Sequence, residues 1–104
     1  MAKWLFVVIT DCTDPSREKE FNDWYDNIHI PDVLETPGFL SATRYVNNNP
    51  TEDTGRFLAT YGIEAEDIDK TMAALQENMR NKTEQGRMSG LVKLVSTAIY
   101  RQIS

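Results

Sequence analysis

The segment from Trp4 to Ile9 places the tightest constraint on the fold, because every residue in it is apolar. A strand with one solvated face alternates apolar and polar residues, so an uninterrupted apolar strand must bury both faces. The segment from Leu91 to Ile99 is likewise apolar or small throughout, apart from Lys93. We therefore expect strands at Lys3–Thr10 and Leu91–Ile103 in a sheet that is covered on both faces.

The stretch that precedes Pro31 predicts the first helix. Asp14 is a good N-cap residue, and Pro15 is tolerated at the first helical position. Proline disfavours helical geometry for the residue before it, so we expect this helix to end at about Ile28. A short further turn is expected from Pro31 to Leu34. The helix has an apolar face with residues at positions i, i+3, i+4 and i+7: Phe21, Trp24, Tyr25 and Ile28.

Two strands and a long connection follow the turn at Pro37-Gly38. Residues Phe39–Val46 alternate, which predicts a strand with Phe39 and Tyr45 on one face and Arg44 on the other. The polar segment Asn47–Gly55 is rich in turn-forming residues and predicts a loop. A third strand is expected at Arg56–Ile63, with Phe57 and Tyr61 on the same face. These two strands should form a hairpin.

The second helix is predicted at Glu64–Lys82, followed by a polar connection from Thr83 to Gly90. Its apolar stripe has helical spacing: Ile68, Met72, Leu75 and Met79. The element order is then β-α-β-β-α-β. This order predicts an α+β, ferredoxin-like fold, with a four-stranded antiparallel sheet and two helices on one face.

Two helices can cover only one face of this sheet, whereas its first and last strands carry apolar side chains on both. The uncovered face would expose on the order of several hundred Å² of apolar surface, more than monomers usually tolerate. A second copy, packed sheet against sheet, is the simplest cover. We therefore expect residues 1–104 to form a single domain that is a homodimer through its sheet face, with a cavity lined by the sheet.

Charge and composition narrow the partners of this domain. A net charge of −5 argues against nucleic acid and anionic membranes, because both select clusters of Lys and Arg. The run Trp4–Ile9 is too short to span a bilayer, and the acidic Asp11 near its end is unlike a signal peptide. We expect a cytoplasmic protein. One cysteine, Cys12, and one histidine are too few for a nitrogen–sulfur metal site within one chain, so no metal is expected.

His29 is the strongest candidate for chemistry and the only histidine in the chain. Imidazole has an unperturbed pKa near neutrality, so it can take and return a proton at pH 7. We predict a general acid–base role, with Asp11 or Asp32 as the carboxylate that orients the ring. Asp11 is also a candidate for substrate binding. The structural alternatives are a histidine that meets the last carbonyls of a helix, and carboxylates that cap or face solvent.

Other candidates lie on the predicted strands. Tyr45 and Tyr61 are catalytic candidates, because a phenol can donate a hydrogen bond to a carbonyl or enolate oxygen. Arg44 is a candidate for binding a substrate carboxylate, with a surface ion pair as the alternative. Arg44 and Tyr45 should not point into one cavity, because adjacent strand residues face opposite ways. Three aromatic residues would line a substrate pocket or pack the core: Trp24, Phe39 and Phe57.

Between residues 21 and 45 the chain carries three linked motifs: Phe21-x-x-Trp24-Tyr25-x-x-x-His29-x-Pro31, Pro37-Gly38-Phe39 and Arg44-Tyr45. With the element order, they resemble the dimeric α+β barrel superfamily, in particular its EthD-like and stress-responsive groups. The spacing from His29 to Pro37-Gly38 is similar to that of methylmuconolactone methylisomerases, which implies proton transfer on a small lactone. The architecture is also similar to that of polyketide cyclases such as olivetolic acid cyclase, which implies His and Tyr chemistry near a cavity.

These observations predict an enzyme that needs no cofactor and acts on a small, apolar, oxygenated molecule. The reaction would be isomerisation, cyclisation or lyase chemistry, with His29 as the acid–base group. Two alternatives remain open. One is a dimer that binds a small ligand or serves a stress response without catalysis, and the other is an EthD-like or haem monooxygenase.

Overall fold

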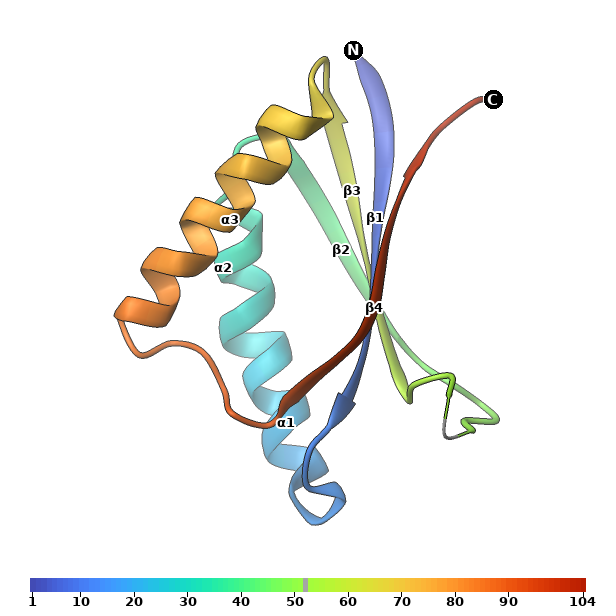
Figure 1. Cartoon of the computed structure of the whole chain (residues 1–104), viewed down its shortest axis with the longest axis vertical. Coiled ribbons are helices and arrows are strands. Elements are labelled where there is room, and N and C mark those ends of the chain that lie inside the picture. The colour runs from blue at the N-terminus through green and yellow to red at the C-terminus, as the bar shows by residue number, and fades with distance from the viewer. Residues whose placement is uncertain (52) are drawn as a thin grey trace.

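The computed structural model describes residues 1–51 and 53–104. The elements follow one another along the chain (Figure 1), η1 being a 3-10 turn and η2 a π-helical turn: β1 (Ala2–Cys12), η1 (Pro15–Arg17), α1 (Glu18–Trp24), η2 (Tyr25–His29), α2 (Ile30–Leu34), β2 (Phe39–Val46), β3 (Phe57–Ala65), α3 (Ile68–Glu84) and β4 (Val92–Arg101). Counting α1, η2 and α2 as one helical run, the predicted β-α-β-β-α-β order is confirmed.

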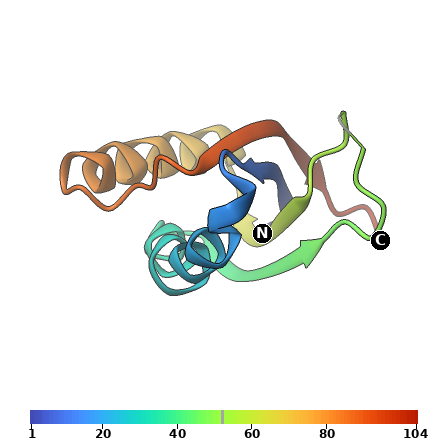
Figure 2. The ribbon, with the colours of Figure 1, turned by 90° about the horizontal axis from the view of Figure 1, so that it is seen from below.

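The four strands form one antiparallel sheet in the order β2-β3-β1-β4. Both helical segments lie on the same side of this sheet, as Figures 1 and 2 show from two directions. This is the ferredoxin-like α+β fold that the sequence predicts. We call the side that carries the helices the covered face, and the other side the open face.

The prediction that the first helix ends at about Ile28, before Pro31, is wrong. The helical run passes from α1 through the π-turn η2 and continues to Leu34 in α2. In the π-turn the N–H of Ile30 donates to the carbonyl of Tyr25, five residues back. The wider turn gives the proline ring room beside the preceding turn, so the chain absorbs Pro31 without a break. His29 therefore lies within a continuous helical run and not at a helix end.

The predicted face of Phe39 in β2 is wrong, because the strand contains a register shift. Phe39 pairs with Ile63 and Ser41 pairs with Gly62, so the intervening residue bulges. The bulge places Phe39 on the covered face, together with Arg44, and not with Tyr45. The prediction that Arg44 and Tyr45 face opposite ways is confirmed, since they pair with consecutive residues of β3.

Strand and helix limits differ from the predicted ones where pairing or capping decides them. β3 extends to Ala65 because its last residues pair with the start of β1. α3 consequently begins only after Asp67, whose side chain accepts the backbone N–H of Lys70. β2 and β3 pair as the predicted hairpin. Within its predicted loop Asn47–Gly55, residue 52 lies outside the described residues.

The core lies between the covered face and the helices. Every second residue of β3 is buried there, from Phe57 to Ala65. Rings from the helical run close over this strand, with Phe21 5.4 Å from Phe57 between ring centroids. The core is therefore mainly aromatic at the end of the sheet where α1 packs.

The open face carries apolar side chains from the same strands. Alternation along β1 places Leu5, Val7 and Ile9 there, opposite the residues that pack on the helices. Leu5 is 41% exposed and Tyr45 on β2 is 56% exposed.

In the described part of the chain, no helix combines the length and apolarity needed to cross a bilayer.

Candidate functional site

The imidazole of His29 lies against aromatic rings on the inner side of the helical run. It stacks on Trp24, with 4.8 Å between ring centroids and 20° between planes, and meets the edge of Tyr25 at 4.9 Å. Burial lowers the pKa of His29 to about 4, against the opposing effect of the Asp32 charge, while Arg44 lowers it further. The ring is therefore neutral at pH 7 and has the unprotonated form that a general base requires.

A buried cation lies next to this ring. The guanidinium of Arg44 is 4.2 Å from the ring centroid of Tyr25. Its Nη1 donates to Asp26 at 3.0 Å and its Nη2 to Asn22 at 2.9 Å. Over residues 1–51 and 53–104, its Nε is the buried side-chain nitrogen that has no hydrogen-bond partner. Arg44 thus forms the ion pair that was its structural alternative, yet keeps one donor unused.

Two phenols complete the cluster on the covered face. Tyr25 is 2% exposed and Tyr61 is 1% exposed. Burial raises the pKa of both, and for Tyr61 the neighbouring Tyr25 adds to this effect. Both phenols stay protonated at neutral pH and can act as hydrogen-bond donors. We call His29, Tyr25, Tyr61 and Arg44 the polar cluster.

The structure brings most of the predicted aromatic residues to this cluster. Phe57 lies under Arg44, with 5.5 Å from the guanidinium carbon to the ring centroid. Phe39 meets Tyr61 at 5.9 Å, edge to face. Trp24 is present through its stack on the imidazole. These rings surround the polar groups with apolar surface, which strengthens their electrostatic interactions.

Two predicted residues lie elsewhere. Tyr45 is on the open face, across the sheet from His29. Asp11 lies at the end of β1, where its carboxylate accepts the backbone N–H of Arg56 at 2.7 Å. The structure therefore does not join either residue to the polar cluster. Tyr25, by contrast, was predicted only as part of the apolar helix face. It lies close to Arg44 because of the way β2 pairs in the sheet, and no local pattern predicts that pairing.

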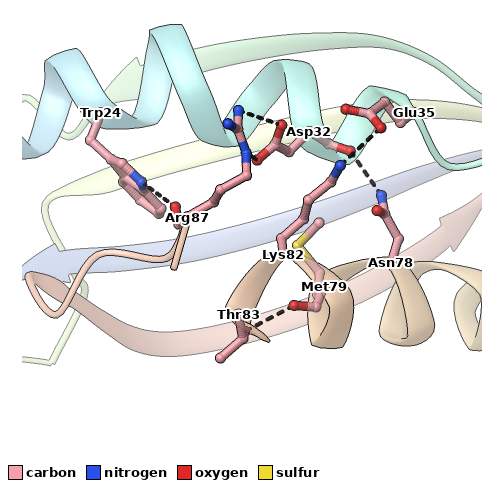
Figure 3. A network of polar contacts seen from close by, with 8 residues as sticks. All are labelled: Trp24, Asp32, Glu35, Asn78, Met79, Lys82, Thr83 and Arg87. Atoms are coloured by element: carbon pink, nitrogen blue, oxygen red, sulfur yellow. Dashed lines mark hydrogen bonds and ion pairs between the residues drawn. The ribbon is translucent and has the colours of Figure 1, made fainter. Parts of the chain in front are cut away.

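Asp32, the other candidate to orient His29, is buried and bound to Arg87. The guanidinium donates to the carboxylate from Nε at 2.7 Å and from Nη2 at 3.0 Å (Figure 3). These hydrogen bonds lower the pKa of Asp32 below its ordinary value, against the effect of burial. The carboxylate is ionised at neutral pH and acts on His29 through its charge. Sequence analysis did not single out Arg87, which lies in a polar connection without a pattern.

One hollow lies on the open face, at the end of the sheet near both termini. It has a volume of about 520 Å³, and its walls include Leu5, Leu40, Ser41, Gly62 and Tyr100. Gly62 forms part of its floor, because a Cβ there would come within 2.6 Å of the Ser41 hydroxyl oxygen. The hollow is thus separated from His29 by the sheet.

The described residues contain no cluster of three or more His, Cys, Asp or Glu side chains able to hold a metal ion.

A family model described as a domain of unknown function, DUF4286, matches residues 5–93. The chain belongs to the DUF4286 family. This match spans β1 to the first part of β4, and therefore both the polar cluster and the Asp32–Arg87 pair. No curated protein matches the chain.

Solved structures share the fold at low identity. SnoaB from Streptomyces nogalater, a cofactor-independent oxygenase, has a TM-score of 0.71 at 9% identity, over 100% of this chain and 96% of its own. An EthD family protein from Bacillus halodurans has a TM-score of 0.60 at 16% identity, and the match covers 99% of this chain and 100% of that protein. A dimeric ferredoxin-like protein from an uncultured marine organism has a TM-score of 0.68 at 13% identity, and the match covers 100% of this chain and 98% of that protein. The DUF4286 chain therefore has the fold of the dimeric α+β barrel superfamily, as the resemblance implied.

Proposed function

We propose that this DUF4286 protein is a cofactor-independent enzyme that performs acid–base chemistry on a small, largely apolar, oxygenated molecule. The observation that carries the proposal is the polar cluster, in which a neutral imidazole, a buried cation and two protonated phenols lie among aromatic rings. Such a group set suits proton removal next to a carbonyl, as in isomerisation, cyclisation or lyase reactions. The shared fold with a cofactor-independent oxygenase supports this class.

The roles of the residues follow from their chemical state. His29 accepts the proton, because it is uncharged at neutral pH. The unused Nε of Arg44 donates a hydrogen bond to the substrate oxygen on which negative charge develops. Tyr61 is a second candidate donor to the same oxygen, in exchange for its interaction with the phenol of Tyr25. Trp24, Phe39 and Phe57 surround these groups with apolar surface.

We further propose that the protein works as a homodimer through the open face. Leu5, Val7 and Ile9 form a continuous apolar row on β1, and a second copy would cover it. Tyr45 lies on this face and is assigned to the dimer contact and not to the reaction. The dimeric ferredoxin-like relative supports this arrangement.

The proposal is tested in two steps. A screen of small carbonyl, lactone and phenolic compounds identifies ligands that raise the melting temperature, because a ligand of the native state stabilises it. Turnover of the ligands is then compared between wild type and His29→Ala. We expect turnover to fall about a hundred- to ten-thousandfold, the usual contribution of a placed proton acceptor. Tyr45→Phe, on the other face, is the matched control and should keep its turnover.

The pH profile gives an independent check. The acid limb of kcat/KM should have its midpoint near pH 4, the pKa of His29, and not near pH 6.5. Unchanged turnover in His29→Ala would remove the imidazole from the mechanism. Stabilisation by ligands without any turnover in wild type would identify a binding protein instead.

A monooxygenase is the second candidate, favoured by the likeness to SnoaB and to an EthD family protein. In a cofactor-independent version, His29 would remove a proton from a phenolic substrate, and the resulting anion would react with molecular oxygen. Ligand-dependent oxygen consumption by the purified protein distinguishes this reaction from isomerisation. A haem-dependent version predicts a Soret band in the protein as purified.

A further inference from the structure

Arg87 lies outside the helical run and binds two of its side chains, Trp24 and Asp32. It lies in the connection from α3 to β4, between Gly86 and the start of β4 at Val92. Its guanidinium holds the buried carboxylate of Asp32 through two hydrogen bonds, and its backbone carbonyl accepts the indole N–H of Trp24 at 2.9 Å (Figure 3). One residue therefore fixes two side chains that are eight positions apart along the helical run.

These two side chains are also the ones that act on His29. The indole of Trp24 stacks on the imidazole at 4.8 Å, so the orientation of the indole determines the face that the imidazole packs against. Asp32 follows His29 by one helical turn, and its charge acts on the imidazole. Arg87 itself binds the carboxylate and not the imidazole.

We propose that Arg87 is the positioning residue of His29: from the α3–β4 connection it fixes Trp24 through its carbonyl and Asp32 through its guanidinium. This inference rests on the proposed role of His29 as the proton acceptor. The bidentate pair keeps the carboxylate turned towards the guanidinium, which neutralises much of its charge. The hydrogen bond to Trp24 keeps the indole flat against the imidazole.

The direction of the effect on His29 follows from the charges around it. Asp32 on α2 favours the protonated imidazole, and Arg44 on β2 disfavours it, while Tyr25 contributes an uncharged ring edge. Arg87 compensates the Asp32 charge from the loop. Without the Arg87 guanidinium, the carboxylate acts on His29 uncompensated, so the pKa of His29 must rise.

Proton NMR measures this directly, because the only histidine gives a single set of imidazole signals. The imidazole is titrated in wild type, Arg87→Gln, Arg87→Lys and the control Arg80→Gln, which removes an exposed arginine from its pair with Glu77. We expect the titration midpoint to rise in Arg87→Gln, by at least about 0.3 pH unit. Arg87→Lys, which keeps the charge but loses the fork, should show a smaller rise. Arg80→Gln should match wild type.

Stacking has a readout of its own. The indole ring current shifts the imidazole proton signals of the neutral form. This shift should diminish in Trp24→Phe and be kept in Arg87→Gln, which retains the backbone carbonyl that accepts the indole N–H. A loss of melting temperature in the Arg87 variants with an unchanged titration midpoint would overturn the proposal and leave a purely structural pair. Since no substrate is needed, the titration stands apart from the enzyme proposal, which fails if His29→Ala keeps its turnover or if wild type shows none.

Discussion

The two faces of the sheet are built from the same strands and differ in almost every physical respect. The covered face buries aromatic rings and two phenols and holds a half-buried imidazole and guanidinium beside them. The open face carries aliphatic side chains that remain partly exposed, such as Leu5. Strand residues alternate between the faces, so a displacement of one position exchanges one environment for the other. We propose on this basis that the covered face holds the chemistry and the open face the dimer contact.

Neighbouring residues of β2 show this contrast at its sharpest. Arg44 points to the covered face, where its side chain is 15% exposed and lies over Tyr25. Tyr45, the next residue, points to the open face and is 56% exposed. Sequence analysis selected both as site residues, and only the first has buried partners. The comparison can be tested by changing each face separately.

The largest effect is expected from a charge on the open face. Leu5→Lys should weaken dimerisation about a thousandfold, equivalent to ~4 kcal/mol, because a two-fold dimer would bury two unpaired ammonium groups. The monomer should stay folded, since Leu5 is 41% exposed in a single chain. Analytical ultracentrifugation over a range of concentrations measures the dissociation constant.

The matched control for this variant is Ala73→Lys, which adds the same charge at an exposed position of α3. It should leave the dissociation constant within about twofold of wild type, as expected of an exposed position. A wild-type protein that sediments as a monomer at all concentrations would contradict the assignment of the open face to assembly.

A smaller effect, on the free energy of unfolding, is expected when His29 on the covered face is protonated. The pKa of His29 is about 4 in the folded chain and near 6.5 when unfolded. Between these values the unfolded chain binds more protons, so the free energy of unfolding falls as the pH is lowered from 6.5 to 4. The loss should reach about 3 kcal/mol. Urea unfolding at fixed protein concentration and several pH values measures it.

His29→Gln tests whether the imidazole causes this loss. The variant should unfold at nearly constant free energy between pH 6.5 and 5, where few carboxylates titrate. The acid sensitivity that remains below pH 4 belongs to groups such as Asp32, whose pKa is lowered by Arg87. An equal slope in wild type and His29→Gln would show that the imidazole is not protected from protonation by the fold.

The smallest effect compares one hydroxyl on each face. Tyr61→Phe should cost about 1 kcal/mol of unfolding free energy, because it removes a buried polar group that interacts with Tyr25. Tyr45→Phe should cost less than about 0.5 kcal/mol, since its hydroxyl belongs to an exposed residue. Both are measured in the Leu5→Lys background, where dimerisation contributes little. Equal costs would remove the distinction between the faces.

Much of the fold was predictable because local patterns determine it. Apolar runs, a Pro-Gly turn and helical spacing predicted the element order, and β2 begins and ends where expected. Local patterns failed at the π-turn, because Pro31 can be accommodated by a wider turn as well as by a break in the helix. They failed at the bulge after Phe39, because the bulge depends on pairing with β3. His29 was selected for its chemistry and for the motif around it. Its neutral state results from burial against Trp24 and Tyr25, which only the folded chain produces.

The sequence by itself determined the β-α-β-β-α-β order, the excess of apolar strand surface and the presence of one histidine. These depend on residue identity and spacing along the chain. Only the tertiary structure decided that Arg44 reaches Tyr25, that Asp32 binds Arg87, and that Tyr45 is separated from His29 by a sheet. The physical reason is that pairing register and side-chain contacts join residues far apart in sequence, whereas local preferences extend over only a few positions.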